Sequence, residues 1–164
     1  MANNPVLLFS FDFLHLMATI VWIGGLMFNV LVVMPSVSKT LDPAQKGKLM
    51  GVMFRRVRVL VYVSLLVLFV TGIPMKIASE YYVAIINFDT NWETVSFIKH
   101  VLVAMMALSA FYSFEILLPS LKKLASQGAS TKIVSLQKQQ AVLARVTFLL
   151  GIVVVFLSAM MKYL

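Results

Sequence analysis

The feature that most constrains this chain is a set of four apolar stretches, each near the length that crosses a bilayer. They cover about residues 7–34, 57–75, 95–118 and 142–161. A transmembrane helix needs about 20 predominantly apolar residues. The stretches explain why the chain is 61% hydrophobic and only 12% charged, a balance that one soluble core of 164 residues would not bury. The sequence therefore predicts an all-α integral membrane four-helix bundle, a single transmembrane domain over residues 1–164.

Proline follows or closes three of the stretches, at Pro35, Pro74 and Pro119. Proline removes a backbone donor and disfavours helix at the residue before it. We therefore expect the first three helices to end at these prolines.

The charged residues separate the two sides of the membrane. The basic residues of the first and third connections are Lys39, Lys46, Lys48, Arg55, Arg56, Arg58, Lys122, Lys123, Lys132, Lys138 and Arg145. The second connection carries Glu80, Asp89 and Glu93, with the aromatic residues Tyr81, Tyr82 and Trp92 that are typical of a membrane interface. Cytoplasmic loops are rich in Lys and Arg, so the net charge of +8 marks topology rather than a nucleic-acid partner. The pattern predicts a multi-pass protein of the cell inner (plasma) membrane, with both termini outside.

The chain has two histidines, His15 and His100, and both fall within predicted spans. Ionisable side chains inside a membrane are costly and usually face the bundle interior or water. The predicted topology places both in the outer half of the membrane at similar depth. Two neutral imidazoles on different helices can bind a haem iron from its two faces, and the absence of cysteine excludes covalent attachment. We therefore predict one haem b with His15 and His100 as its metal ligands.

The first helix offers surroundings for a planar cofactor. Helical spacing places one set of residues on a single face: His15, Thr19, Trp22, Leu26 and Asn29. Gly24 and Gly25 leave the backbone open to close approach. From this helix we predict Thr19, Trp22 and Gly25 as cofactor-binding residues.

The other helices add small and basic residues. Ala104 and Ala107 lie below His100, where a flat ring needs small neighbours. Lys76 and Lys99 lie near the outer edge, where they could meet the propionates. We predict Ala104, Lys76 and Lys99 as further cofactor-binding residues.

Two carboxylates lie within or beside the spans. Glu115 and Arg145 both lie near the inner ends of helices, so an interhelix ion pair is expected. Asp12 is one turn from His15 and either orients that imidazole or touches interfacial water.

Other interpretations of the histidines remain open. Each can simply hydrogen-bond to a neighbouring helix. Copper is the alternative cofactor, since the chain has eleven methionines and thioethers favour Cu(I), although methionine is also a common packing residue.

Short motifs along most of the chain resemble one superfamily of membrane proteins. They are residues 13–16 (FLHL) with 22–28 (WIGGLMF), 54–56 (FRR), 71–72 (TG), 97–103 (FIKHVLV) and 143–146 (LARV). The first helix resembles CopD-type copper-resistance membrane proteins and HemJ-type protoporphyrinogen oxidases, and the other motifs are similar to the CopD pattern. HemJ-type proteins tend to carry a second histidine after a tyrosine near the end of helix three, where residues 111–113 here read Phe-Tyr-Ser. The resemblance implies a CopD-like four-helix fold.

These observations together predict a bis-histidine b-type haem protein that transfers electrons at the outer side of the membrane. We expect an electron-transfer protein or subunit rather than a stand-alone enzyme, with no catalytic residue assigned. Its expected partners are the lipid bilayer, a quinone or redox partner protein, and further subunits of an oligomer or complex. The alternatives are a copper-handling permease of CopD type and a structural accessory subunit of a membrane complex.

Overall fold

The described part of the chain forms a bundle of four long helices. The computed structural model describes residues 4–79, 88–126 and 130–164, and the predicted belt residues Tyr81 and Tyr82, with Glu80, lie outside them. Within these ranges, four helices are long and apolar enough to cross a membrane: Pro5–Thr40, Gln45–Ile77, Asn91–Leu124 and Thr131–Tyr163. The all-α membrane bundle predicted from the sequence is confirmed.

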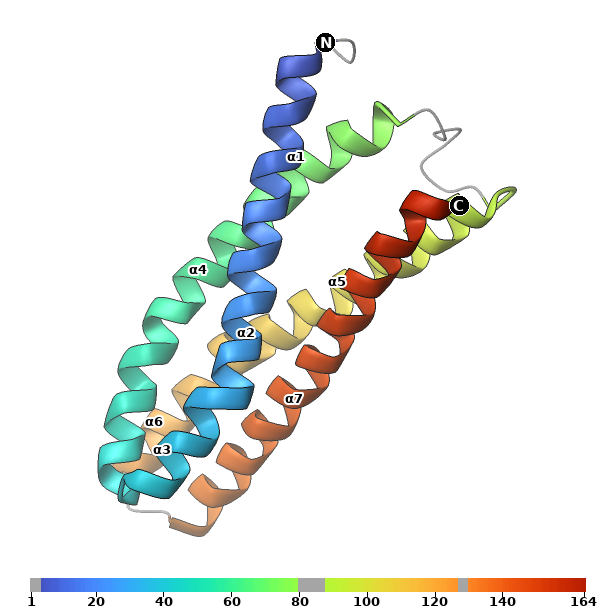
Figure 1. The fold of residues 1–164 in the computed structure, drawn as a ribbon. Helices are drawn as coiled ribbons and strands as arrows, with labels where there is room; N and C mark the ends of the chain where they lie inside the picture. Colours follow the sequence, from blue (N-terminus) through green and yellow to red (C-terminus); the bar gives the residue numbers. More distant parts are fainter. Residues whose placement is uncertain (1–3, 80–87, 127–129) are drawn as a thin grey trace.

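Each of the four long helices consists of one or more of the elements labelled in Figure 1, and we call each of them a rod. Two of the four rods are interrupted by π-helical turns. The first consists of α1 (Pro5–Thr19), η1 (Ile20–Gly24), α2 (Gly25–Phe28), η2 (Asn29–Val33) and α3 (Met34–Thr40). The third consists of α5 (Asn91–Phe111), η3 (Tyr112–Leu117) and α6 (Leu118–Ser126). The second is α4 (Pro43–Ile77), and the fourth is α7 (Ser130–Met160) followed by the short 3₁₀ turn η4 (Met161–Tyr163).

Side-chain oxygens start three of the rods. Asn4 Oδ1 accepts from the backbone N–H of Val6 at the start of α1. Asp42 Oδ1 accepts from Gln45 N–H in α4, at 2.9 Å. Thr90 caps α5 in the same way, since its hydroxyl oxygen accepts from the backbone N–H of Glu93. Each bond satisfies a donor that the first turn of a helix leaves without a partner.

The helices continue through the prolines at which they were expected to end, and that prediction is wrong. Pro35 and Pro119 each follow within two residues of a π-helical turn, and Pro74 lies three residues before the end of α4. An interior proline clashes with the carbonyl four residues earlier. The wider π-helical hydrogen-bond pattern directly before Pro35 and Pro119 changes the position of those carbonyls, so the chain stays helical. In lipid, ending the helix would leave backbone N–H and C=O groups without hydrogen-bond partners, which costs more free energy than distorting the helix.

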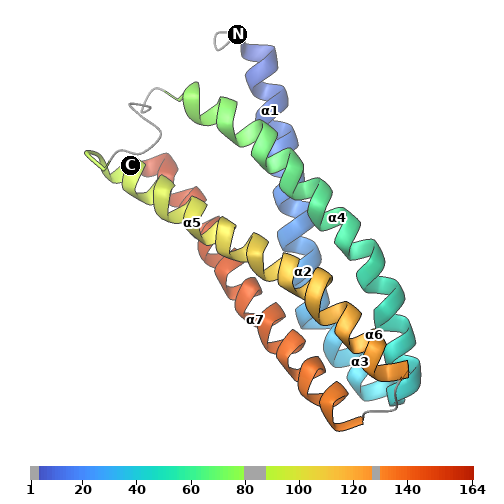
Figure 2. The same cartoon turned by 180° about the vertical axis from the view of Figure 1, so that it is seen from behind.

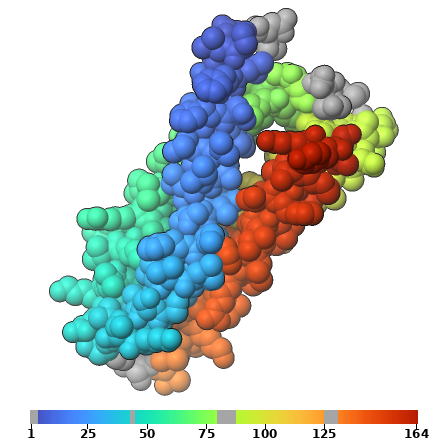
Figure 3. Space-filling model, viewed as in Figure 1, coloured from blue at the N-terminus to red at the C-terminus, as the bar shows by residue number. Residues whose placement is uncertain are grey.

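The helices pack as two pairs. Helices α1 and α4 lie side by side, as do α5 and α7, and the two pairs meet along the half of the bundle that holds α3 and α6 (Figure 1; Figure 2). Toward the other end, which carries both termini, the pairs separate. The space-filling view shows a hollow there between α1 and the last turns of α7 (Figure 3).

A small core joins the two pairs, and the outer surface is apolar. The buried core cluster consists of Trp22, Val61, Met106, Phe114 and Val154, so every rod contributes to it. Large apolar side chains point outward from every rod as well, as Phe9, Phe69, Leu108 and Phe156 show. Such continuous apolar exposure suits lipid and not water.

Candidate functional site

The imidazole of His15 is held by the neighbouring helix. Its Nδ1 lies 2.9 Å from Thr71 Oγ1 on α4. The Thr71 hydroxyl donates its one hydrogen to the carbonyl of Val67, at 2.7 Å. Its oxygen therefore accepts from His15, whose Nδ1 must carry the proton. This tautomer leaves the lone pair of the neutral ring on Nε2, ready to bind a metal.

The imidazole of His100 has the same tautomer for a different reason. Its Nδ1 bonds to the backbone carbonyl of Ser96, one turn earlier in α5. A carbonyl oxygen can only accept, so Nδ1 donates and Nε2 keeps the lone pair. Ser96 itself is buried, whereas His100 is exposed. The bond to Ser96 therefore leaves His100 Nε2 without a role in holding the ring.

The two histidines lie at similar positions along their helices. His15 lies ten residues after Pro5, the first residue of α1, and His100 lies nine after Asn91, the first residue of α5. Both helices begin at the end of the bundle where the two pairs separate (Figure 1). The side chains are close enough to interact electrostatically. These positions along the helices agree with the similar depth expected from the sequence, and the depth in the membrane stays a prediction.

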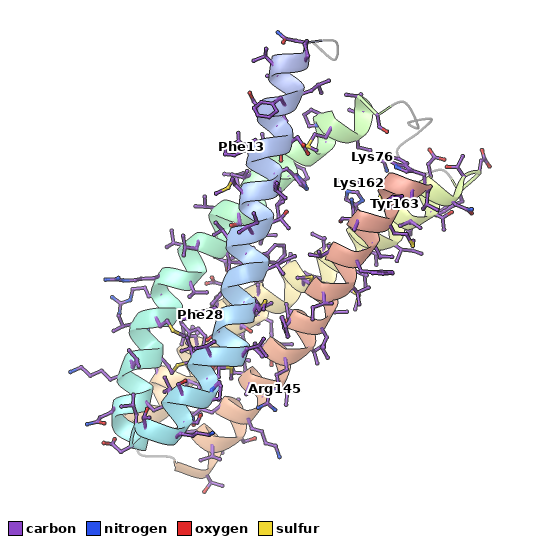
Figure 4. All side chains as sticks on the ribbon, viewed as in Figure 1. Phe13, Phe28, Lys76, Arg145, Lys162 and Tyr163 are labelled. Carbon is purple, nitrogen blue, oxygen red and sulfur yellow. The ribbon has the colours of Figure 1, made fainter. Side chains whose placement is uncertain are left out.

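Two lysines lie within electrostatic range of the histidines. Lys99 lies close enough to His15 to interact with it electrostatically, and both Lys99 and Lys76 lie close enough to act on His100. Lys76 comes from the last turn of α4, in the region where Lys162 and Tyr163 end the fourth rod (Figure 4). The structure therefore brings His15, Lys76, Lys99 and His100 within electrostatic range of one another, as a group. We call this group the outer site, after the side of the membrane predicted for it.

The remaining predicted cofactor-binding residues lie elsewhere or have other partners. The Thr19 hydroxyl donates to the carbonyl of His15, at 2.8 Å, within its own helix. Trp22 is only 4% exposed and packs in the core cluster. Gly25 lines a cavity between the helices, and Ala104 is exposed one turn from His100. The helix-one face predicted from spacing is present, since all five of its members are at least partly buried.

The close helix approach expected at Gly24 and Gly25 occurs instead at Gly72. A Cβ added to Gly24 or Gly25 would meet nothing within 4 Å. A Cβ added to Gly72 would lie 3.2 Å from His15 Cε1. The glycine that lets a helix fit against the imidazole is therefore on α4.

Glu115 has partners other than the one expected, and Asp12 does not accept the Nδ1–H of His15. Glu115 Oε1 lies 3.0 Å from Arg58 and accepts a hydrogen bond from the Tyr62 hydroxyl at 2.6 Å. The predicted pair of Glu115 with Arg145 is wrong, and Arg145 is exposed (Figure 4). Asp12 is exposed and close to His15, but the Nδ1–H of His15 goes to Thr71.

Sequence reasoning missed the residues that hold the imidazoles. Ser96 lies four residues before His100, a spacing that places its carbonyl beside a helical ring and could have been noticed. Thr71 and Gly72 lie 56 and 57 residues after His15, and no local pattern connects them. Their only signal was a Thr-Gly pair near the end of an apolar stretch.

Comparison with known proteins gives a family without an assigned activity. No curated protein and no solved structure matches the chain. Residues 17–130 match a family described as a domain of unknown function (DUF4149). The match begins two residues after His15, covers the rest of the first rod with the second and third rods, and ends at the first residue of α7. The chain therefore belongs to the DUF4149 family.

Proposed function

We propose that this chain is a membrane electron-transfer protein that holds one haem b between His15 and His100. The observation that carries the proposal is the shared tautomer of the two histidines. Each ring donates its Nδ1–H to an oxygen of the protein, and each therefore offers Nε2 to a metal. Metal-binding histidines almost always have their second nitrogen oriented in this way.

The outer site fits haem in its chemistry. Among the described residues, no group of three or more His, Asp or Glu gathers to hold a metal ion, which leaves the imidazole pair as the donor set of this proposal. Two imidazoles are a common axial set for iron, and Lys76 and Lys99 supply positive charge for two propionates. Haem, when bound, would supply reversible one-electron chemistry. Thr71 and Ser96 would fix the planes of the two imidazoles.

Further parts of the proposal concern the surroundings. We propose that the chain belongs to the CopD/HemJ-like superfamily and lies in the plasma membrane with both termini outside. The basic first and third connections support this orientation. The outer site would then exchange electrons with a quinone or an outer partner protein, as a member of an oligomer or complex.

Two substitutions test the ligation. The wild-type protein, His15→Ala and His100→Ala are each expressed with haem supplied, and their absorption spectra are recorded with and without carbon monoxide. Wild type should be low-spin and unreactive with carbon monoxide. Each variant should lose haem or become high-spin and reactive. Thr19→Val is the matched control, since its hydroxyl bonds only to its own helix.

Three results would overturn the proposal. An unchanged low-spin spectrum in His100→Ala would mean that His100 is not a ligand. A wild type that binds copper and no haem would favour the copper-handling permease. A wild type that binds neither would favour a structural accessory subunit.

A further inference from the structure

A second polar feature lies deeper in the bundle, away from the outer site. A cavity of about 100 Å³ opens between the rods near their middles. Its polar or backbone-exposing lining residues are Trp22, Gly25, Asn29, Ser109, Ser113 and Thr147. The rest of its wall is apolar, and no charged side chain of the described residues lines it. We call it the midplane cavity.

Asn29 is the most informative residue of this lining. It is only 7% exposed, and its Oδ1 has no hydrogen-bond partner among the described residues. A buried polar atom without a partner costs roughly 1–3 kcal/mol, more where no water can reach it. An amide oxygen in this position indicates that a hydrogen-bond donor from outside the protein binds there.

The hydroxyls of the cavity also offer acceptors. The Thr147 hydroxyl donates to the carbonyl of Leu143 at 2.8 Å, so the 2.7 Å bond between Ser109 and Thr147 has Ser109 as its donor. The lone pairs of Ser109 Oγ remain available. The Ser113 hydroxyl makes no hydrogen bond with another residue of the described ranges, although its backbone carbonyl accepts from Leu118 N–H. Asn29, Ser109 and Ser113 together present acceptor oxygens from two rods.

All three π-helical turns of the described chain reach this cavity. Trp22 lies in η1, Asn29 in η2, and Ser113 with Phe114 in η3. A π-helical turn is rare and often marks a functional position, because it replaces the regular backbone hydrogen bonds. Three such turns surround one cavity, and two of them lie two residues before a proline, so the regular helical hydrogen bonding is interrupted around the cavity.

We infer that the midplane cavity is a hydration site that holds a small cluster of ordered water molecules within the membrane. Water can donate to the acceptors of Asn29, Ser109 and Ser113 without adding a charge to this uncharged site. One water needs about 10–15 Å³ of such volume and two to four polar partners, so the cavity has room for several. Helix turns that break their regular bonding in a membrane are commonly satisfied by ordered water.

Hydroxyl-radical labelling in lipid nanodiscs tests this inference. Radiolysis of water inside a protein oxidises the side chains beside it, and oxygen-isotope-labelled water identifies the source. Trp22 and Phe114 line the cavity yet are only 4% and 6% exposed. Met106 is 0% exposed, belongs to the same core cluster and does not line the cavity, so it is the internal control. We expect labelled oxygen in Trp22 and Phe114, at several times the extent in Met106, although methionine is the more easily oxidised residue.

A variant pair then connects the label to the polar lining. Asn29→Leu combined with Ser113→Ala should reduce labelling of Trp22 several-fold. Ser158→Ala removes a hydroxyl that bonds only to the Val154 carbonyl, and labelling should not change. If Trp22 and Phe114 are labelled no more than Met106 in the wild type, the cavity is dry. Labelling that disappears when sodium or ammonium is added would mean a cation site. Either result overturns the inference, whether or not the double variant folds.

Discussion

At the scale of single residues, each histidine is defined by the oxygen that receives its Nδ1–H. Thr71 on the neighbouring helix holds His15, and the Ser96 carbonyl within the same helix holds His100. The His15 ring therefore depends on helix packing, whereas the His100 ring depends only on α5. Substitutions at the two partners should have different consequences.

Thr71→Val keeps the shape of the side chain and removes the acceptor for His15. The Nδ1–H would lose its partner and the ring would no longer be held in one orientation. Loss of such a partner typically weakens metal binding about 10- to 100-fold, and we expect haem affinity to fall by that order. Haem titration of the purified protein measures it. Thr19→Val is the control, and equal affinity in the two variants would contradict the role of Thr71.

At the scale of elements, the contact of α1 with α4 determines where His15 points. Gly72→Ala would place a methyl group 3.2 Å from His15 Cε1, and the hydrogen bond to Thr71 opposes movement of the ring. We expect a loss of about 1 kcal/mol or more, as in other overpacked sites. Gly24→Ala adds the same group into open space and should be neutral or stabilise by up to about 1 kcal/mol, because alanine favours helix. Thermal unfolding compares the two, and equal stabilisation would refute the close contact.

A second contact between elements joins α4 to η3 through Arg58, Tyr62 and Glu115. The Arg58 guanidinium also lies over the Tyr62 ring, 5.8 Å from its centre. We expect Arg58→Met to destabilise the protein by about 1 kcal/mol, since both ions are partly exposed. Arg145→Met should change stability by less than about 0.5 kcal/mol. Denaturation in detergent measures both, and a larger effect at Arg145 than at Arg58 would contradict the stabilising role of the Arg58–Glu115 pair.

The elements also show what the sequence can predict. Apolar length alone predicts the four rods, because the bilayer requires about 20 such residues for each span. It does not predict where they end, since Pro35 and Pro119 are accommodated by π-helical turns that no local pattern indicates. Topology predicts that His15 and His100 lie at similar positions along their helices, and they lie ten and nine residues after the first residues of α1 and α5. The direction in which a side chain points around its helix depends on packing. The sequence therefore paired Glu115 with Arg145, whereas the structure pairs it with Arg58.

At the scale of the whole molecule, the outer site lies where the two helix pairs separate. Both termini are at that end of the bundle (Figure 1). The predicted orientation places this end outside the cell, with the basic connections inside. A reporter fused after Leu164 should therefore behave as external, and one inserted near Lys46 as cytoplasmic. The reverse pattern would place the outer site on the cytoplasmic side and exclude an outer redox partner.

The central claim is that His15 and His100 bind one haem iron between them. Electron paramagnetic resonance of the oxidised, haem-loaded wild type tests it most directly, because the signal depends on the axial ligands. Two imidazoles predict a low-spin signal of bis-histidine type that is lost in both His15→Ala and His100→Ala. A high-spin signal in wild type, or a low-spin signal that survives in either variant, would contradict the account.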